Sequence, residues 1–430
     1  MTVHVFCGPT LGAAEVRALL PAAVVHPPIR HGDALRLDAG PGDRVLIVDG
    51  VFHQSASVRH KEILALMGAG AVVVGCSSMG ALRAAELDVY GMIGVGEVYR
   101  SYKDGRTDAD ADVAVTHTQG PEVEQLSIAM ADMESQLRAA HRAGAIDGAE
   151  RAAIAAALRG VHYTERSPRL LARLEAPGSA AFRAWLSEHP DGAKRRDALT
   201  ALRLLAEGAF APTDPGAWID REWRTEHLAE WTDRHTGPVH GTRRISTLAQ
   251  RQYRQIFDAD YPQWWRARVL AWIADAADGL RLDDLTADQR LHWLTPAENA
   301  ALDPGEALAR LLVRTAASGP TWPGRDRPAA APDPAVLDAV ARAYAANDRA
   351  AALGIDLDRL DTGAVRHYLQ QLWRLTDATP EARTAAARDR GFRDFGTAAE
   401  ATRQFILSQL GPNLWNLLHR RRTETGRPPA

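Results

Sequence analysis

Short apolar runs and longer stretches of helical spacing follow one another along the first 120 residues. The apolar runs are rich in β-branched residues and stop at glycine, proline or aspartate, which is typical of strands buried in a parallel sheet. The stretches between them repeat their apolar residues at the spacing of one helix face. We expect strands at 3–6, 24–25, 44–48 and 71–74, and helices at 13–20, 58–67 and 79–87. Strands that alternate with helices in this way indicate a parallel sheet covered on both faces.

The pattern changes further along the chain. Residues 90–99 contain glycines that predict turns, the charged residues 100–112 predict a mobile loop, and Val113–Val115 predict a last short strand. Helical spacing follows over 122–143 and 149–158, and after about residue 160 almost no strand signal is left. The expected fold class is therefore α/β, with an N-terminal parallel-sheet (Rossmann-like) domain followed by a large all-α region. The expected divisions are the α/β domain over 1–160, a helical region over 161–319, a Pro/Gly/Ala linker over 320–332 and a C-terminal helical region over 333–430.

One stretch, Val72–Leu87, combines a buried strand, a tight turn and a helix start. Ser77 and Ser78 lie in the turn, where a serine either caps the helix or stands beside free backbone N–H groups that can hold an oxyanion. Glycines at 75 and 80 give the turn the character of a nucleophile elbow, although the spacing is not G-x-S-x-G. Both interpretations stay open, and Ser78 is the preferred nucleophile because its separation from Gly80 reproduces the S-x-G half of that motif.

Three loops should meet at the carboxyl edge of the predicted sheet, where open α/β sheets bind their ligands. They are residues 7–10, 49–53 and 76–80. Asp49 and His53 can then supply the orienting group and the base that a nucleophilic Ser78 needs. His53 can equally be a loop histidine that only bonds the turn. Lys61, near the next helix start, is an alternative base, although charges at helix starts are usually just solvated.

Composition excludes several classes of protein. The 430 residues are 46% hydrophobic and 24% charged with a net charge of -3, which is typical of a soluble globular protein and gives no reason to expect nucleic-acid or polybasic membrane binding. The two cysteines, Cys7 and Cys76, fall in or beside predicted buried strands, which argues against a disulfide framework or a cysteine zinc site and favours the cytoplasm. Cys76 could be an activated thiol beside a helix start, but a buried inert cysteine is the simpler interpretation.

Neither a membrane span nor a bound cofactor is expected. No apolar run is long enough to cross a bilayer. Histidine, aspartate and glutamate do not recur at metal-ligand spacing, and the glycines of residues 91–96 are not followed by the Lys-Ser/Thr of a phosphate loop. We therefore expect no metal and no cofactor.

Several motifs in a fixed order carry a resemblance to a known family. They are Gly8–Leu11, Asp49–His53, Arg59–Ile63, Ser77–Leu87 and Gly91–Gly96 with Tyr99. Together they resemble the TfuA-like core domain, over about residues 1–120. Residues 160–430 carry no motif of this kind.

The resemblance implies sulfur chemistry on peptides. TfuA-like proteins are accessory partners of YcaO enzymes, which use ATP to activate a backbone amide and replace its oxygen with sulfur. The function this implies is hydrolysis of a thiocarboxylated ubiquitin-like sulfur-carrier protein, which delivers sulfide to a YcaO enzyme during backbone thioamidation of ribosomal peptides. A precursor peptide is a further expected partner, whereas nucleic acid and membrane are not.

Two other functions compete with this one. The chain could be a non-catalytic adaptor or activator that recruits the sulfur carrier or the YcaO enzyme. It could also be an unrelated serine hydrolase of small esters, which the missing G-x-S-x-G spacing counts against.

The candidate site residues form two groups. The catalytic candidates are Ser78, His53, Asp49, Ser77 and Lys61. The substrate-binding candidates are Gly8, Thr10, Arg59, Glu62, Met79, Gly80, Arg83 and Glu97. For Arg83 the default expectation is an ordinary ion pair with Glu86 one helical turn away.

Overall fold

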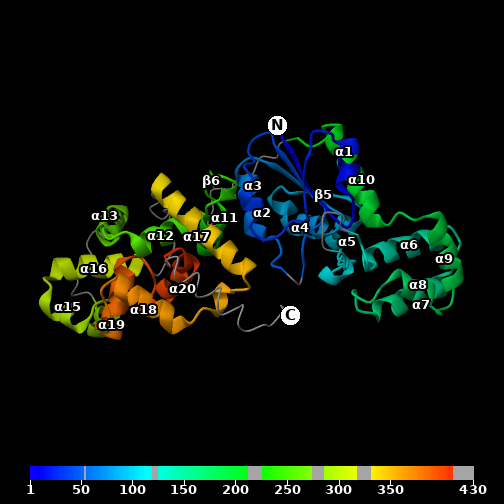
Figure 1. Cartoon of the computed structure of the whole chain (residues 1–430). Coiled ribbons are helices and arrows are strands. Elements are labelled where there is room, and N and C mark those ends of the chain that lie inside the picture. Colours follow the sequence, from blue (N-terminus) through cyan, green and yellow to red (C-terminus); the bar gives the residue numbers. More distant parts are fainter. Residues whose placement is uncertain (53–54, 119–123, 212–224, 274–284, 317–330, 410–430) are drawn as a thin grey trace. The chain divides into compact units, whose positions relative to one another are not determined.

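The computed structural model describes residues 1–52, 55–118, 124–211, 225–273, 285–316 and 331–409. The chain divides into two compact units, Met1–Arg224 and Thr225–Ala430 (Figure 1). Residue 160, where the α/β domain was expected to end, lies inside the first unit. All but the last two residues of the expected linker 320–332 lie outside the described residues.

The first unit contains a five-stranded, all-parallel sheet with strand order β2-β1-β3-β4-β5. Its strands are β1 (Val3–Phe6), β2 (Val24–His26), β3 (Arg44–Ile47), β4 (Val72–Cys76) and β5 (Ile93–Val95). The predicted parallel sheet and its first four strands are confirmed. The order reverses between β1 and β3, which makes this the switch point where doubly wound sheets bind ligands.

The prediction for the last strand is wrong. The fifth strand is Ile93–Val95, and Val113–Val115 is not part of the sheet. Glycine is depleted in strands, which hides this one in the sequence. Here Gly94 pairs with Gly75 of β4, and a Cβ at Gly94 would stand 2.2 Å from the Tyr99 ring, so the position has no room for a side chain.

Ten helices of the described residues belong to the first unit. They are α1 (Ala13–Leu19), α2 (Asp33–Arg36), α3 (His60–Gly68), α4 (Met79–Leu87), α5 (Gly96–Lys103), α6 (Met130–Arg142), α7 (Gly148–Arg159), α8 (Pro168–Ala172), α9 (Ser179–Glu188) and α10 (Ala193–Ala206), with single turns at Asp88–Tyr90 and Asp110–Asp112. The predicted α4 is confirmed to the residue. The expected loop 100–112 is partly helical, because α5 continues through Lys103.

Helices cover both faces of the sheet. Val45, Ile47 and Val73 pack with Ile63 and other apolar residues of α3 on one face. On the other face, alternate strand residues such as Leu46, Val72 and Val74 pack with Val16 of α1 and with Ala198, Ala201, Leu202 and Leu205 of α10. A helix that begins at residue 193 therefore completes the sheet domain, which is the reason that the domain extends past residue 160.

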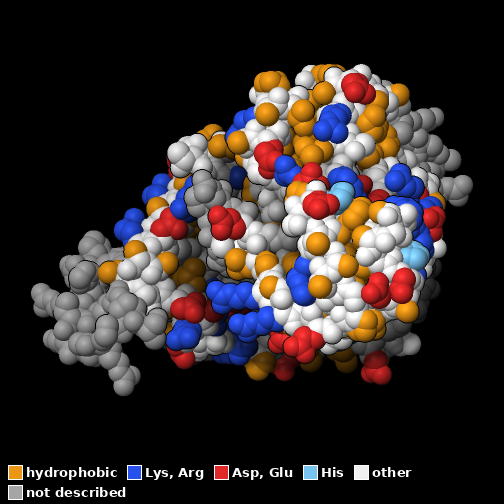
Figure 2. All heavy atoms as spheres, turned by 90° about the vertical axis from the view of Figure 1, so that its right-hand side faces the viewer, with side chains coloured by type: hydrophobic (Ala, Val, Ile, Leu, Met, Phe, Trp, Pro, Cys, Tyr) orange, Lys and Arg blue, Asp and Glu red, His pale blue; other side chains and the backbone are white. Residues whose placement is uncertain are grey.

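Helices α6, α7 and α9 form a smaller cluster beside the sheet, centred on Met133, Leu137, Ile154 and Phe182. The face of the molecule that includes these helices carries acidic and basic side chains interspersed (Figure 2). Ion pairs such as Arg138–Glu97 at 2.8 Å join α6 to α5.

The second unit is almost entirely helical. Its elements are α11 (Glu226–His235), β6 (Val239–His240), β7 (Arg243–Arg244), α12 (Thr247–Phe257), α13 (Tyr261–Ile273), α14 (Ala287–Trp293), α15 (Pro296–Ala301), α16 (Pro304–Ala316), α17 (Pro334–Ala352), α18 (Thr362–Leu372), α19 (Pro380–Asp389) and α20 (Phe395–Ile406), with single turns at Leu357–Arg359 and Leu407–Gln409. The expected all-α region is confirmed apart from the two-residue strands β6 and β7. Across the described residues, none of the helices combines the length and the apolar character that a membrane span requires.

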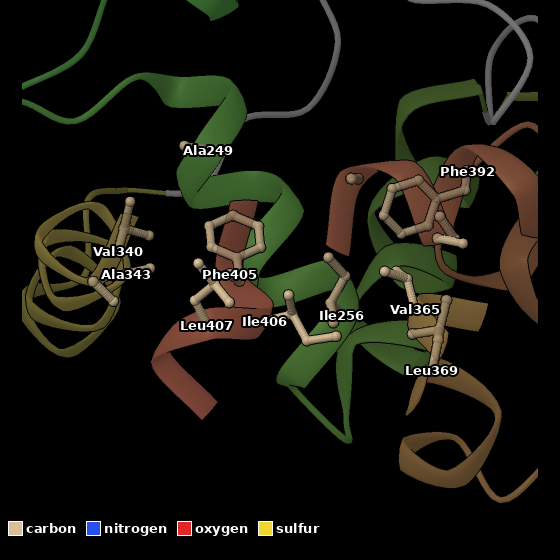
Figure 3. Packing of buried hydrophobic residues seen from close by; sticks show 14 of the residues in the cluster. Ala249, Ile256, Val340, Ala343, Val365, Leu369, Phe392, Phe405, Ile406 and Leu407 are labelled. Atoms are coloured by element: carbon tan, nitrogen blue, oxygen red, sulfur yellow. The ribbon is translucent and has the colours of Figure 1, made fainter. Parts of the chain in front are cut away.

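One hydrophobic core joins α12 to α17, α18 and α20 (Figure 3). Phe405 of α20 is fully buried between Ile256 of α12 and Val340 of α17 in this cluster. Residues of the regions 161–319 and 333–430 therefore share one core.

Candidate active site

The turn between β4 and α4 has an unusual backbone. Ser77 has a φ of 66°, in the left-handed region that non-glycine residues seldom adopt. Its hydroxyl donates to the main-chain carbonyl of Lys194 in α10 at 2.7 Å, and Ser77 is fully buried. Ser78 follows as the N-cap of α4, but its side chain caps no helix N–H. The turn thus directs the two hydroxyls to different neighbours.

Two glycines let α4 begin directly against the strand ends. A Cβ on Gly80 would stand 1.7 Å from the carbonyl oxygen of Ile47, and one on Gly75 would stand 2.1 Å from the carbonyl oxygen of Gly80. Both lie far inside van der Waals contact. The glycines flanking the two serines are therefore required by the close approach of α4 to β3 and β4.

Asp49 holds together the loops that follow β1 and β3. Its Oδ2 accepts the N–H groups of Gly8 at 2.9 Å and Thr10 at 3.0 Å, and its Oδ1 accepts the hydroxyl of Thr10 at 2.6 Å. The predicted convergence of these loops is present, and it occurs at the switch point of the sheet. Gly8 and Thr10 contact the carboxylate of Asp49, so all three residues shape this edge.

A cavity of about 60 Å³ opens at the same edge. Asp49, Ser78 and Met79 line it from the sheet side, and residues 110–117 form much of the opposite wall. Small-molecule sites usually enclose about 300–1,000 Å³, so this cavity suits a small acyl group or the end of a chain. Of the two serines, Ser78 is the one that lines it.

His117 is a lining residue that the sequence did not single out. Its Nδ1 lies 2.8 Å from the carbonyl oxygen of Thr118. Because a carbonyl only accepts, Nδ1 carries the proton in this hydrogen bond, and Nε2 of the neutral ring is an acceptor. His117 is half-buried in the cavity wall with Ser78. The expected base His53 lies outside the described residues.

Start-of-helix N–H groups lie next to Ser78. The N–H of Ser78 donates to the carbonyl oxygen of Cys76 at 2.8 Å, and the N–H of Gly80 donates to the carbonyl oxygen of Val48 at 3.3 Å. Among the described residues, the Met79 N–H donates no hydrogen bond. A free N–H group at a helix start can donate to an oxyanion.

A buried lysine reaches the cavity wall from α10. Lys194 is only 2% exposed, and its Nζ donates to the carbonyl oxygen of Val113 at 3.0 Å. The hydroxyl of Ser78 lies 3.5 Å from the same oxygen. Asp132 accepts the main-chain N–H of Lys194 at 2.8 Å, and burial raises the pKa of this carboxyl while the charge of Lys194 lowers it.

Three of the predicted site residues lie on α3 or at its N-cap, and none of them lines the cavity. Glu62 is fully buried and accepts from His31 and from the N–H of Gly32, both at 2.6 Å, and from the N–H of Arg59 at 3.1 Å. Arg59 is exposed, and Lys61 is partly buried in the first turn of α3. None of the three lines the described cavity.

Two further candidates take part in ion pairs. Arg83 pairs with Glu86 at 2.6 Å, as predicted, and its Nε donates to the carbonyl of Val58 at 3.2 Å. Glu97 pairs with Arg138 at 2.8 Å and accepts the hydroxyl of Ser135 at 2.8 Å. Their charged groups contact neighbouring protein elements and do not line the cavity.

Both cysteines are buried and free. Burial raises the pKa of the Cys76 thiol, and burial together with the charge of Asp49 raises the pKa of Cys7 to about 12. Neither thiol is therefore activated as a nucleophile. No cluster of three or more metal-ligating side chains occurs among the described residues.

Residues 49–167 match the family described as TfuA-like protein, which confirms the resemblance. The match includes Asp49, Ser77, Ser78 and His117, whereas Gly8–Leu11 and Lys194 lie outside it. No curated protein matches the chain. The family match supports a role linked to thioamide biosynthesis by YcaO enzymes.

Proposed function

We propose that this chain, whose residues 49–167 match the TfuA-like family, hydrolyses the thiocarboxylate of a ubiquitin-like sulfur-carrier protein and releases sulfide for a YcaO enzyme. The observation that carries the proposal is the small cavity at the switch point, with Ser78 in its wall next to the start of α4. Its size suits the end of a protein chain, which is where the carrier bears its thiocarboxylate.

The reaction is an acyl transfer, which needs a nucleophile, a proton acceptor and donors for the oxyanion. Ser78 is the nucleophile in this proposal, and the Met79 N–H is the donor to the oxyanion. His117, which is half-buried in the wall, accepts through Nε2 the proton of the water that later hydrolyses the acyl-serine.

Asp49 has a positioning role in this scheme. Both of its carboxylate oxygens already accept hydrogen bonds from the loop after β1, so it holds the cavity wall in place. Its further role as the orienting group of His53 stays a proposal from the sequence. Met79 and Gly80 shape the substrate end of the cavity, Met79 by lining it and Gly80 by letting α4 approach.

The test uses the full chain with a thiocarboxylated carrier protein. Wild type should convert the thiocarboxylate to carboxylate, seen in the intact mass of the carrier, and release sulfide. Ser78→Ala should lower the rate by at least about 1,000-fold, because it removes the nucleophile. Ser187→Ala is the matched control, since this serine of α9 likewise donates to a main-chain carbonyl but is exposed.

The adaptor alternative predicts a different result. If the chain only recruits the carrier or the YcaO enzyme, Ser78→Ala keeps partner-dependent thioamidation at the wild-type level. An unchanged carrier mass after incubation with wild type would reject the hydrolytic function.

A further inference from the structure

An open groove of about 250 Å³ lies in the second unit, between α19 and the chain that joins α14 to α15. We call it the α19 groove. Leu291 at its edge is 46% exposed, although it is a large apolar side chain. Both walls supply apolar residues, namely Leu291, Trp293, Leu294, Pro296, Pro380 and Ala385. Apolar surface that solvent reaches in this way is typical of a contact with another chain.

Opposite charges lie on the α19 wall of this groove. Glu381 stands in the first turn of α19 and Arg388 in its last turn, and both line the groove. They are seven residues apart, which is two helical turns or about 10 Å along the axis and keeps both on one face. The lining residues of α19 between them are Thr384 and Ala385, which are small. This wall therefore allows close approach in the middle and carries opposite charges at its two ends.

The guanidinium of Arg388 has no carboxylate in ion-pair range within the part of the chain that the structure describes. It donates to two main-chain carbonyl oxygens, at 3.1 and 2.5 Å, and its central carbon lies 4.5 Å from the centre of the Trp293 ring. Burial and the charge of Arg314 lower the pKa of Arg388, whereas the charge of Asp394 raises it. A half-buried cation in these surroundings favours a carboxylate from another chain.

We propose that the α19 groove binds an amphipathic helix of a partner protein, which lies antiparallel to α19. The helix places an acidic side chain beside Arg388 and, seven residues later, a basic side chain beside Glu381. Apolar side chains three and four residues after the acid fill the groove between Trp293 and Ala385. The groove belongs to the second unit, outside the TfuA-like match, and its occupation does not depend on the proposed hydrolysis.

Charge and helix direction agree in the antiparallel orientation. Glu381 and Arg388 match the dipole of α19, because acids stabilise the first turn of a helix and bases the last. An antiparallel partner whose acid precedes its base has the same advantage, and each of its charges meets an opposite one. A parallel partner would need its base first, against its own dipole. The groove therefore selects the direction of the helix as well as its composition.

The experiment measures the binding of synthetic peptides to the full chain by fluorescence anisotropy. The matched peptide is a fluorescein-labelled, alanine-rich helix of about 18 residues, with leucines three and four residues after a glutamate and a lysine seven residues after it. The reference peptide has the same composition with glutamate and lysine exchanged. The matched peptide should saturate wild type below about 100 μM, and the reference should bind at least about 10-fold more weakly, because both charge contacts become repulsive.

Substitutions locate the binding. Thr384→Trp fills the groove, and Leu291→Asp places a charge at its exposed edge, so either should abolish binding of the matched peptide. Glu381→Arg should weaken this binding about 5-fold, and a peptide with glutamate in place of its lysine should regain the lost affinity. Glu226→Arg is the matched control, because Glu226 is likewise an exposed glutamate in the first turn of a helix, α11, and does not line the groove. The thermal unfolding midpoint shows whether each variant is folded.

Three results would overturn the proposed partner helix. The first is equal binding of the two peptides, or no saturable binding of the matched one. The second is binding that remains unchanged in folded Thr384→Trp and Leu291→Asp. The third is self-association of wild type that Leu291→Asp abolishes, because a second copy of the chain would then cover the groove. Sedimentation velocity without peptide makes that last comparison.

Discussion

Two adjacent serines in the β4–α4 turn have different surroundings. Ser77 takes the left-handed backbone conformation, and its hydroxyl binds α10, whereas Ser78 has its hydroxyl at the cavity. Residue spacing cannot rank them, because both precede the same helix start. With its φ of 66°, Ser77 makes the hydrogen bond to α10, and Ser78 is the serine that lines the cavity.

A histidine substitution tests, at the scale of single residues, whether His117 serves the hydrolysis of the acyl-serine. In His117→Ala, the water that hydrolyses the acyl-serine loses its proton acceptor, so this hydrolysis should slow and a covalent carrier–protein adduct should accumulate. Intact mass spectrometry of the reaction shows this adduct directly. It should be absent when Ser78→Ala is added to His117→Ala, and its absence from the single variant as well would contradict the role of His117.

At the scale of elements, helix α10 and the start of α4 complete the site. α10 covers one face of the sheet, supplies Lys194 and caps α5 through Asp197, whose carboxylate accepts the N–H groups of Glu97 and Val98, both at 2.8 Å. None of this is visible in residues 193–206 alone, which have the pattern of any amphipathic helix. The contribution of α10 comes from its contacts with the sheet and with α5.

Gly80 tests the close approach of α4 to the sheet. Gly80→Ala should lower the free energy of unfolding by roughly 3 kcal/mol or more, because the new Cβ would fall 1.7 Å from the carbonyl oxygen of Ile47. Gly148→Ala is the matched control in α7, where the Cβ has only an ordinary contact at 3.8 Å, and it should be neutral or stabilising by about 0.5–1 kcal/mol. Urea denaturation of both variants gives the comparison, and equal costs would contradict the packing argument.

The raised pKa of Asp197 predicts that the free energy of unfolding depends on pH. Burial raises its pKa to about 6, against the opposing effect of the Val98 and Glu97 N–H groups. A raised pKa in the folded state means that its contribution is fully present at low pH and is lost as the pH rises through about 6. Relative to Asp197→Asn, wild type should therefore lose stability between about pH 4 and pH 6. Denaturation curves across this range check the slope, and a constant difference would disprove it.

At the scale of the whole molecule, the protein consists of two units, each with its own hydrophobic core. The sheet, the cavity and the TfuA-like region all belong to Met1–Arg224. The second unit has its own helical core, to which α12 and α20 contribute from distant parts of the sequence. The chemistry proposed for Ser78 should therefore depend on the first unit.

A substitution at Phe405 tests whether the cores of the two units are independent. It is fully buried and makes edge contacts with Tyr253 at 5.5 Å and Phe257 at 6.1 Å between ring centroids. Phe405→Ala should cost the second unit about 3–5 kcal/mol and speed hydrogen exchange in α17 and α20. Exchange in β3 and β4, and sulfide release from the carrier, should not change. The exposed Leu372→Ala is the control, and faster exchange in the sheet would contradict separate cores.

The sequence by itself determined the parallel strands, the helix α4 and the TfuA-like motif, because each depends on residues close together in the chain. Even so, the strand that contains Gly94 was not predicted, because the ring of Tyr99 leaves no room for a side chain at that position and the sequence does not show this contact. The tertiary structure alone decided which distant residues meet at the site. The main-chain carbonyl of Lys194 accepts the hydroxyl of Ser77, which lies 117 positions earlier in the sequence. His117 lines the cavity from a segment outside the sheet. Contacts between such distant positions arise from packing on a common sheet, and no local pattern of side chains encodes them.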